Sequence, residues 1–193
     1  MPSLWTDTIE SHRREVRDAV LDATASLVAR HGLLSVTMSR IAEDAGIGRA
    51  TLYKYFPDVE AILHAWHGRE IARHLDHLVA VRDGAGDDPL ERLQTVLQAY
   101  AEQAFGSRGH HESELAALLH RSRQVATAEL RIRGMVRALV REGVETGDIR
   151  SDVPLEELVS FGLTALAAAS SLSSRAAVRR LVDLVLAGMA PSR

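Results

Sequence analysis

The chain has 193 residues, long enough for one large or two small domains, and its 46% hydrophobic content is ample for a packed core. It has no cysteine, which excludes disulfides, thiolate metal sites and a cysteine nucleophile. The N-terminus has no apolar run after a basic region, and the weakly polar run at residues 161–172 is too short to span a bilayer. We therefore expect a cytoplasmic protein with no membrane partner. The net charge of −3 is compatible with a nucleic-acid partner only if the basic residues are clustered.

The first helix is expected from about residue 11 to His31. Residues 1–10 have no apolar periodicity and are expected to form a mobile tail. Gly32 is placed to end the helix, because glycine takes a left-handed conformation without steric cost. Near the helix start, Arg13 and Arg14 either reach DNA phosphates or are ordinary solvated charges, and the sequence favours neither interpretation. The apolar face of this helix is expected to consist of Val16, Val20, Ala23, Leu27 and Val28.

Residues 37–56 have the pattern of a helix-turn-helix. Thr37 is a plausible N-cap, and small or apolar residues recur at helical spacing after it. Gly46 stands where the first helix must stop, and Ile47 is the apolar plug of the turn. A second short helix is expected from about Arg49 to Phe56, with Leu52, Tyr55 and Phe56 able to face inward.

The outward face of this second helix carries groups that suit a DNA major groove. Arg49 can read guanine bidentately, and Ala50 or Thr51 can touch a thymine methyl. Thr37, Tyr53 and Lys54 are more typical of phosphate contacts, which position the helix rather than specify a sequence. The pattern alone is equally compatible with a helical hairpin whose polar face is merely solvated.

A longer string carries a family resemblance. Ile41-Ala-Glu-Asp-Ala-Gly-Ile47, then Thr51-Leu-Tyr-Lys-Tyr-Phe56-Pro-Asp and Glu60-Ala-Ile-Leu63, resembles the N-terminal domain of the tetracycline-repressor (TetR) family over about residues 13–63. The sequence departs from the family pattern at Gly48, where a serine is frequent, at Tyr55, where a histidine is frequent, and at Val59, where a basic residue is common. The resemblance implies that DNA is contacted by Thr37, Gly48, Arg49, Ala50, Thr51, Tyr53, Lys54 and Tyr55.

The remaining sequence predicts helices separated by glycine- and proline-rich breaks. The fold class is all-α with about nine helices, divided into a DNA-binding domain at residues 11–57 and a ligand-binding and dimerisation domain at residues 58–193. The expected later helices cover about residues 58–82, 89–105, 112–120, 124–146, 155–171 and 175–189.

The resemblance also implies a function. Family members are transcriptional regulators, so we expect a non-enzymatic repressor that binds a near-palindromic operator in double-stranded DNA as a homodimer, through the last two helices at about residues 155–189. A small-molecule effector is expected in the C-terminal domain, although ordinary core packing explains each candidate residue equally well. The residues expected to line its pocket are Trp66, His67, Ile71, Tyr100, Phe105, Met135 and Phe161.

Two other classes stay open. Histidines at i and i+3, such as His64 with His67 and His74 with His77, share a helix face and make a metal-binding or hydrolytic protein conceivable. No carboxylate completes a familiar ligand string, so we predict no metal site, no cofactor and no catalytic residue. A protein-interaction module that has lost DNA binding is the other alternative, with Gly48 and Val59 as its supporting features.

Overall fold

The structure is a computed structural model that describes residues 4–106 and 123–191, with side chains from Glu10 onward. The described chain is helical and contains no strand, which confirms the all-α prediction. None of the described helices is both long and apolar enough to cross a bilayer. The elements are α1 (Leu4–His31), η1 (Leu33–Ser35), α2 (Met38–Asp44), α3 (Arg49–Tyr55), α4 (Val59–Gly84), α5 (Pro89–Gly106), α7 (Arg123–Thr146), α8 (Leu155–Ala167), η2 (Ala168–Ser171) and α9 (Arg175–Met189).

Most helix ends lie where the sequence predicts them. Ser174 accepts a hydrogen bond from the Ala177 N–H and starts α9. Asp58 caps α4 in the same way, because its Oδ1 accepts from the Ala61 N–H at 2.8 Å. Gly147, with φ of 87°, follows the end of α7. The helix expected at residues 112–120 lies outside the described residues.

Two helix boundaries differ from the prediction. The tail expected at residues 1–10 is too long, because α1 already begins at Leu4. An apolar stripe indicates that one side of a helix is buried, not that a helix forms. Its absence from residues 4–10 therefore did not exclude a helix. The helix expected at residues 155–171 is α8 followed by the 3-10 turn η2, where the Ser170 hydroxyl donates to the Ala167 carbonyl at 3.0 Å and competes with regular helical bonding.

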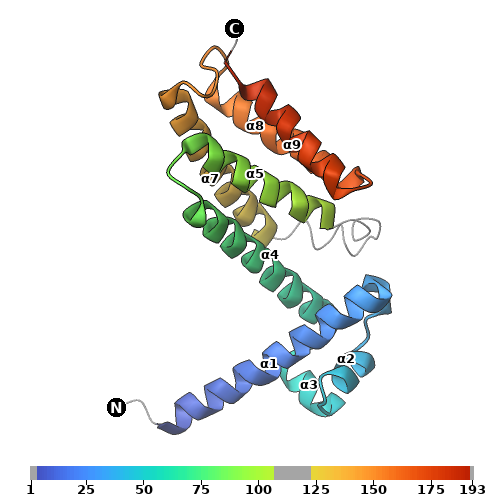
Figure 1. Cartoon of the computed structure of the whole chain (residues 1–193). Helices are drawn as coiled ribbons and strands as arrows, with labels where there is room; N and C mark the ends of the chain where they lie inside the picture. Colours follow the sequence, from blue (N-terminus) through green and yellow to red (C-terminus); the bar gives the residue numbers. More distant parts are fainter. Residues whose placement is uncertain (1–3, 107–122, 192–193) are drawn as a thin grey trace. The chain divides into compact units, whose positions relative to one another are not determined.

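The described chain forms two compact units, residues 4–70 and residues 71–106 with 123–191. The boundary falls inside α4, whereas the domain division predicted from the sequence is at residues 57 and 58. That predicted division stays a prediction. In the first unit, α1 packs on α2 and η1, and α2 packs on α3 (Figure 1). Its core contains Val20, Leu21, Leu27, Val28, Val36, Met38, Ile41, Ala42, Leu52, Phe56, Ile62 and Leu63.

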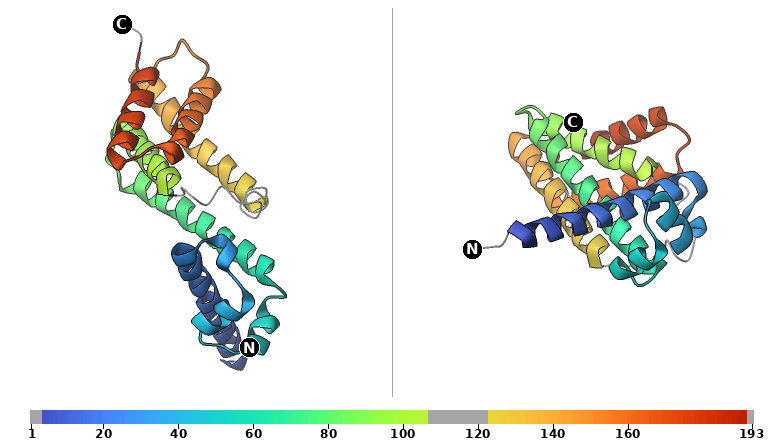
Figure 2. Two further views of the ribbon diagram at one scale, coloured as in Figure 1. Left: turned by 90° about the vertical axis from the view of Figure 1, so that its right-hand side faces the viewer. Right: turned by 90° about the horizontal axis from the view of Figure 1, so that it is seen from below.

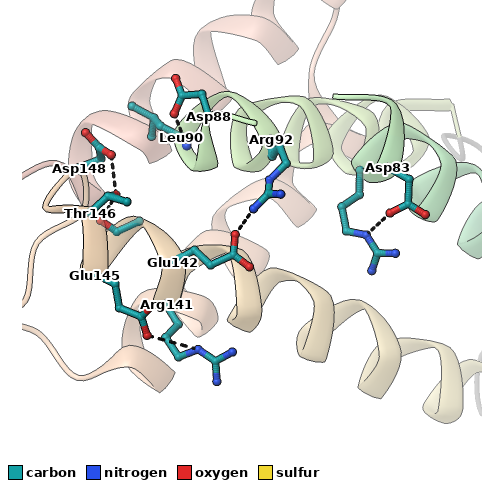
Figure 3. A network of polar contacts seen from close by, with 11 residues as sticks. Asp83, Asp88, Leu90, Arg92, Arg141, Glu142, Glu145, Thr146 and Asp148 are labelled. Carbon is teal, nitrogen blue, oxygen red and sulfur yellow. Dashed lines mark hydrogen bonds and ion pairs between the residues drawn. The ribbon is translucent and has the colours of Figure 1, made fainter. Parts of the chain in front are cut away.

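The second unit is built from α5, α7, α8 and α9, which pack around a separate aliphatic core (Figure 2). An ion pair between Arg92 of α5 and Glu142 of α7 joins two of these helices at the rim of this core (Figure 3). At the end of α7, the Ile149 N–H donates to the Gly143 carbonyl at 2.9 Å, and the Ile149 side chain fills the space beside Gly143. The loop after α7 is therefore a packed part of this unit.

Two apolar residues of the later helices are exposed. Leu130 in α7 is 72% exposed, and Val79 in α4 is 37% exposed. Each lies off the buried stripe of its helix at 100° per residue, which for α7 runs through Val136, Val140 and Gly143. An apolar residue in a helix is therefore buried only where it falls on that stripe.

Candidate nucleic-acid interface

Hydrogen bonds define both ends of α2, the helix that leads into the turn before α3. Thr37 has the extended backbone of an N-cap, and its hydroxyl accepts from the Arg40 N–H at 3.3 Å, as predicted. Gly46, with φ of 67°, donates to the Glu43 carbonyl at 3.1 Å, while the Ile47 N–H donates to the Ala42 carbonyl at 3.0 Å. This pair of bonds is a Schellman motif, which stops α2 and sets the direction in which α3 leaves.

The two faces of α3 differ sharply in polarity. Leu52 is fully buried, and Phe56, which follows the helix, is 3% exposed. Arg49, Ala50, Tyr53 and Lys54 are exposed on the opposite side. Thr51 and Tyr55 are half-buried at the edges, and Tyr55 packs against the core. The helix therefore presents one guanidinium, one ammonium and one phenol on a surface that its apolar side holds in place.

The charges on this surface are available to a partner. Within the described part of the chain, no acid forms an ion pair with Arg49 or Lys54. Two acids on neighbouring elements are engaged elsewhere: Asp44 pairs with Arg30 at 2.5 Å, and the Asp58 carboxylate caps α4. Glu43 of α2 is exposed. A polyanion approaching α3 would therefore meet two cations that no ion pair within the described residues engages.

The scaffold beneath α3 is closely packed. Ile41 is fully buried and Ala42 is 3% exposed, and the small Ala42 side chain allows a close helix contact. Thr24 of α1 is the one polar side chain buried among the described residues, and its hydroxyl donates to the Val20 carbonyl at 2.8 Å. Burial of this group without a partner would be costly, so the bond removes a penalty of about 1–3 kcal/mol.

Three contacts that brace α1 were not predicted from the sequence. Arg30 pairs with Asp44 and ties the end of α1 to the end of α2. Arg69 of α4 pairs with Asp22 of α1 at 2.8 Å. The Arg17 guanidinium carbon lies 4.7 Å from the centroid of the Phe56 ring, a cation–π geometry. Each pair is distant in sequence, and no local spacing signals it.

Two of the three departures from the family pattern, Gly48 and Val59, have different structural consequences. Gly48 is the N-cap of α3 and supplies no side-chain hydrogen bond, so one orphan N–H of the first turn lacks an intramolecular acceptor. Val59 is half-buried and packs against the first unit's core, which is a structural role that a charged residue could not take. The glycine thus leaves the start of α3 without a side-chain cap, whereas Val59 contributes packing.

The residues predicted to line an effector pocket lie in both units. Trp66 and His67 are adjacent on α4, with ring centroids 6.3 Å apart. In the second unit, half-buried Tyr100, Phe105 and Met135 pack against one core, Ile71 is half-buried on α4, and Phe161 is 46% exposed. Burial raises the pKa of the Tyr100 hydroxyl, and the Glu129 carboxylate raises it further.

A surface hollow of this unit is lined by residues outside the predicted set, namely Arg141, Val144, Ser151, Asp152, Val153, Pro154 and Leu155. The pocket predicted from the sequence, with Trp66, His67 and the five residues of the second unit, therefore stays a prediction.

The histidines do not form a metal centre within residues 4–106 and 123–191, where no three histidine, aspartate or glutamate side chains come together. His64 instead lies 3.7 Å from Glu60, one turn earlier on α4. His110, His111 and His120 lie outside the described residues.

Two family models match the chain. Residues 20–66 match the model described as bacterial regulatory proteins of the tetR family, and residues 88–191 match the SbtR-like C-terminal domain of transcriptional regulators. Among curated relatives, the transcriptional repressor KstR of Rhodococcus jostii is 35% identical over 96 residues, covering 49% of this chain and 44% of that protein. KstR of Mycobacterium tuberculosis is 29% identical over 182 residues, covering 88% of this chain and 82% of the relative. The first curated relatives are thus matched over less than half of their own length.

Solved structures have the same fold. A TetR transcriptional regulator from Streptomyces coelicolor aligns with a TM-score of 0.63 at 28% identity, covering 92% of this chain and 99% of that one. A TetR/AcrR-family regulator from Thermobifida fusca aligns with a TM-score of 0.75 at 21% identity, covering 89% and 97%.

Proposed function

This chain belongs to the tetracycline-repressor (TetR) family of transcriptional regulators, and from that premise we propose that it is a ligand-responsive repressor that binds a near-palindromic operator as a homodimer. The observation that carries the DNA-reading part is the exposed face of α3, with Arg49, Tyr53 and Lys54 opposite the buried Leu52. A rigid helix with cations and small residues on its outer side suits a major groove. Repression is supported by the curated KstR relatives, whose names describe repressors.

We assign the roles on α3 by chemistry. Arg49 is in the first turn and is the base reader, with Ala50 and Thr51 beside it for apolar contact with thymine. Tyr53 and Lys54 bind phosphates, as Thr37 does at the start of α2. Gly48 and Tyr55 flank this surface and complete the set of proposed DNA-contacting residues.

An exposed apolar patch on α8 and α9 supports the homodimer. Phe161 of α8 lies against Gly188 of α9, where an added Cβ would be 3.1 Å from the ring. Leu184 is one helical turn before Gly188 on the same face and is 69% exposed. Two large apolar side chains side by side on the second unit are what a two-fold partner would cover. Such a dimer would present two α3 helices to major-groove segments about 34–36 Å apart.

We propose that an effector binds the C-terminal domain and favours a conformer with lower operator affinity. Of the residues predicted for its pocket, Ile71, Tyr100, Phe105 and Met135 are half-buried in the second unit and are the candidates for this site. The effector must bind the two conformers with different affinities, because a ligand that binds both equally shifts nothing.

The proposed roles on α3 are tested by comparing base preferences of two single variants. Arg49→Ala should relax preference at one operator position, with a loss of about 1–3 kcal/mol for the preferred base. Lys54→Ala should weaken binding to all sequences alike and reduce the salt dependence of affinity by about one phosphate contact. The measurement is a binding profile over all single-base changes of the operator, at several salt concentrations.

The two variants serve as controls for each other, because both remove one cation from the same exposed helix face. If Arg49→Ala kept the full base preference and Lys54→Ala lost it, the roles would be reversed. If neither variant changed binding, α3 would not be the reading element.

A further inference from the structure

Helix α1 projects beyond the bundle that it packs against. It begins at Leu4, but its first buried residue is Val20, and residues 10–15 are all exposed (Figure 1). The view from below shows the same projection past α3 (Figure 2, right). A helix rises about 1.5 Å per residue, so residues 10–15 alone span roughly 9 Å of exposed helix before the packed part of α1.

The projecting turns continue the buried stripe of α1 with arginines. Within the bundle the stripe contains Val20, Leu21, Thr24 and Val28, which face the core. Arg17 lies three residues before Val20 and four before Leu21, so it shares their face of the helix. Arg14 and Arg13 lie three and four residues before Arg17 and continue that face. Guanidiniums therefore occupy, outside the bundle, the side of the helix that is apolar inside it.

Acidic residues lie both on and off this stripe. Glu15 is off it; it accepts a hydrogen bond from the Ser11 hydroxyl at 3.4 Å and lies 3.9 Å from a ring nitrogen of His12. Asp18 is about a quarter turn from Arg17 but four residues after Arg14, so it shares the helix face of Arg14. Glu10 shares the stripe at its outer end. Three arginines against these two acids leave the stripe with a net positive charge where it leaves the bundle.

Arg17 shows which way the stripe faces. Its guanidinium carbon is 4.7 Å from the centroid of Phe56, the residue that ends α3. The stripe is therefore on the α3 side of α1, and Arg13 and Arg14 extend it by about one helical turn, or roughly 6 Å. Beyond the end of α3, no described element of this unit covers them.

We propose that Arg13 and Arg14 contact the DNA backbone just outside the base pairs that α3 reads. This inference rests on the proposed function, since it requires α3 to be in the major groove. Among the described residues, Arg13 and Arg14 form no ion pair with an acid. Exposed guanidiniums are well suited to phosphate oxygens, which they bind in a bidentate fork. The contacts lengthen the operator footprint by flanking base pairs whose sequence is not read.

The experiment compares two duplexes that share the selected operator core. One ends at the core, and the other carries about ten further base pairs, one helical turn, on each side. The wild-type protein should bind the longer duplex about tenfold more tightly, with a steeper salt dependence of about 0.9 in log–log slope per added phosphate contact. Arg13→Gln/Arg14→Gln should lose this gain and bind the core duplex as the wild type does.

Two control variants separate the stripe from a general charge effect. Arg123→Gln/Arg131→Gln removes the same charge from exposed positions of α7 and should keep the gain. Arg13→Lys/Arg14→Lys keeps the charge on α1 and should retain most of it. Circular dichroism should be unchanged in all three, because every altered side chain is exposed.

The inference is overturned if the wild type binds both duplexes equally, or if Arg13→Gln/Arg14→Gln keeps the gain. A wild-type protein that binds neither duplex overturns the proposed function itself, and this inference with it. Binding to the core duplex distinguishes the two failures: it is retained when only this inference fails, and it is lost when the proposed function fails.

Discussion

Gly46 and Gly48 stand two residues apart in the turn before α3, and they have opposite backbone requirements. Gly46 has φ of 67°, a left-handed conformation that side chains disfavour. Gly48 has φ of −70° and an extended ψ of 144°, which any N-cap residue can adopt. A Cβ added at Gly48 would meet only the Thr51 hydroxyl, at 3.9 Å. The glycine at position 48 is therefore not needed by the backbone.

We expect Gly48→Ser to stabilise the protein by a few tenths of a kcal/mol, because the new hydroxyl can accept an N–H of the first turn of α3. DNA affinity should rise as well, since the start of the recognition helix would be better ordered. Gly46→Ser is the matched control and should cost about 1 kcal/mol, because its positive φ is strained for any L side chain. Thermal unfolding followed by circular dichroism measures both, and a lower Tm for Gly48→Ser would contradict the capping explanation.

Some features of the helix-turn-helix could be predicted from single residues. Thr37 was correctly predicted as an N-cap, Gly46 as the helix stop and Leu52 as a buried residue, because N-caps, C′ glycines and apolar spacing are local signals. The Arg17–Phe56 and Arg69–Asp22 contacts were missed because they join separate helices. Their geometry depends on packing angles that no local pattern encodes.

Helix α7 contains two glycines with different surroundings, and they test the packing of the second unit. A Cβ at Gly143 would lie 2.6 Å from Ile149 Cδ1 and 2.8 Å from its Cγ1, whereas a Cβ at Gly134 would meet nothing within 4 Å. Ile149 is itself 3% exposed, so it has little room to move. The loop after α7 can approach the helix this closely only because Gly143 has no side chain.

Gly143→Ala should lower the free energy of unfolding by about 1–2 kcal/mol, because the overpacking cost exceeds the gain in helix propensity. Gly134→Ala should instead raise it by up to about 1 kcal/mol, since alanine is the better helix former at an exposed position. Urea unfolding of both variants measures these changes in the free energy of unfolding. Equal behaviour of the two variants would show that Ile149 does not pack on Gly143.

At the level of elements, boundaries were predictable where a capping or stop residue announces them, as Ser174 does for α9 and Asp58 for α4. The start of α1 was not, because its projecting turns have no apolar stripe. The change from α8 to η2 also escaped prediction, since alanine and serine at residues 167–171 are compatible with either helix type.

For the whole molecule, the apolar patch of Phe161 and Leu184 should decide the oligomeric state. Leu184→Glu should convert the proposed dimer to monomer, because burying a leucine contributes about 1.5–3 kcal/mol and a two-fold interface counts it twice. We expect a dissociation constant raised by at least about a hundredfold, measured by sedimentation equilibrium. Helicity should be retained, because Leu184 is 69% exposed in the single chain.

Arg179→Glu is the matched control on the same helix. Arg179 is exposed but lies on a different face of α9 from Leu184, so its charge reversal should leave the dimer intact. A Leu184→Glu protein that stayed dimeric would place the dimer interface elsewhere on the chain.

The central claim is that two copies of α3 read a symmetric DNA sequence. In-vitro selection of binding sites from a random duplex pool, at about physiological salt, tests it most directly, because salt sets the non-specific background. We predict enrichment of an inverted repeat whose half-sites are about one helical turn apart, as two recognition helices on one duplex face require. A folded, dimeric protein that enriched no sequence would contradict the claim.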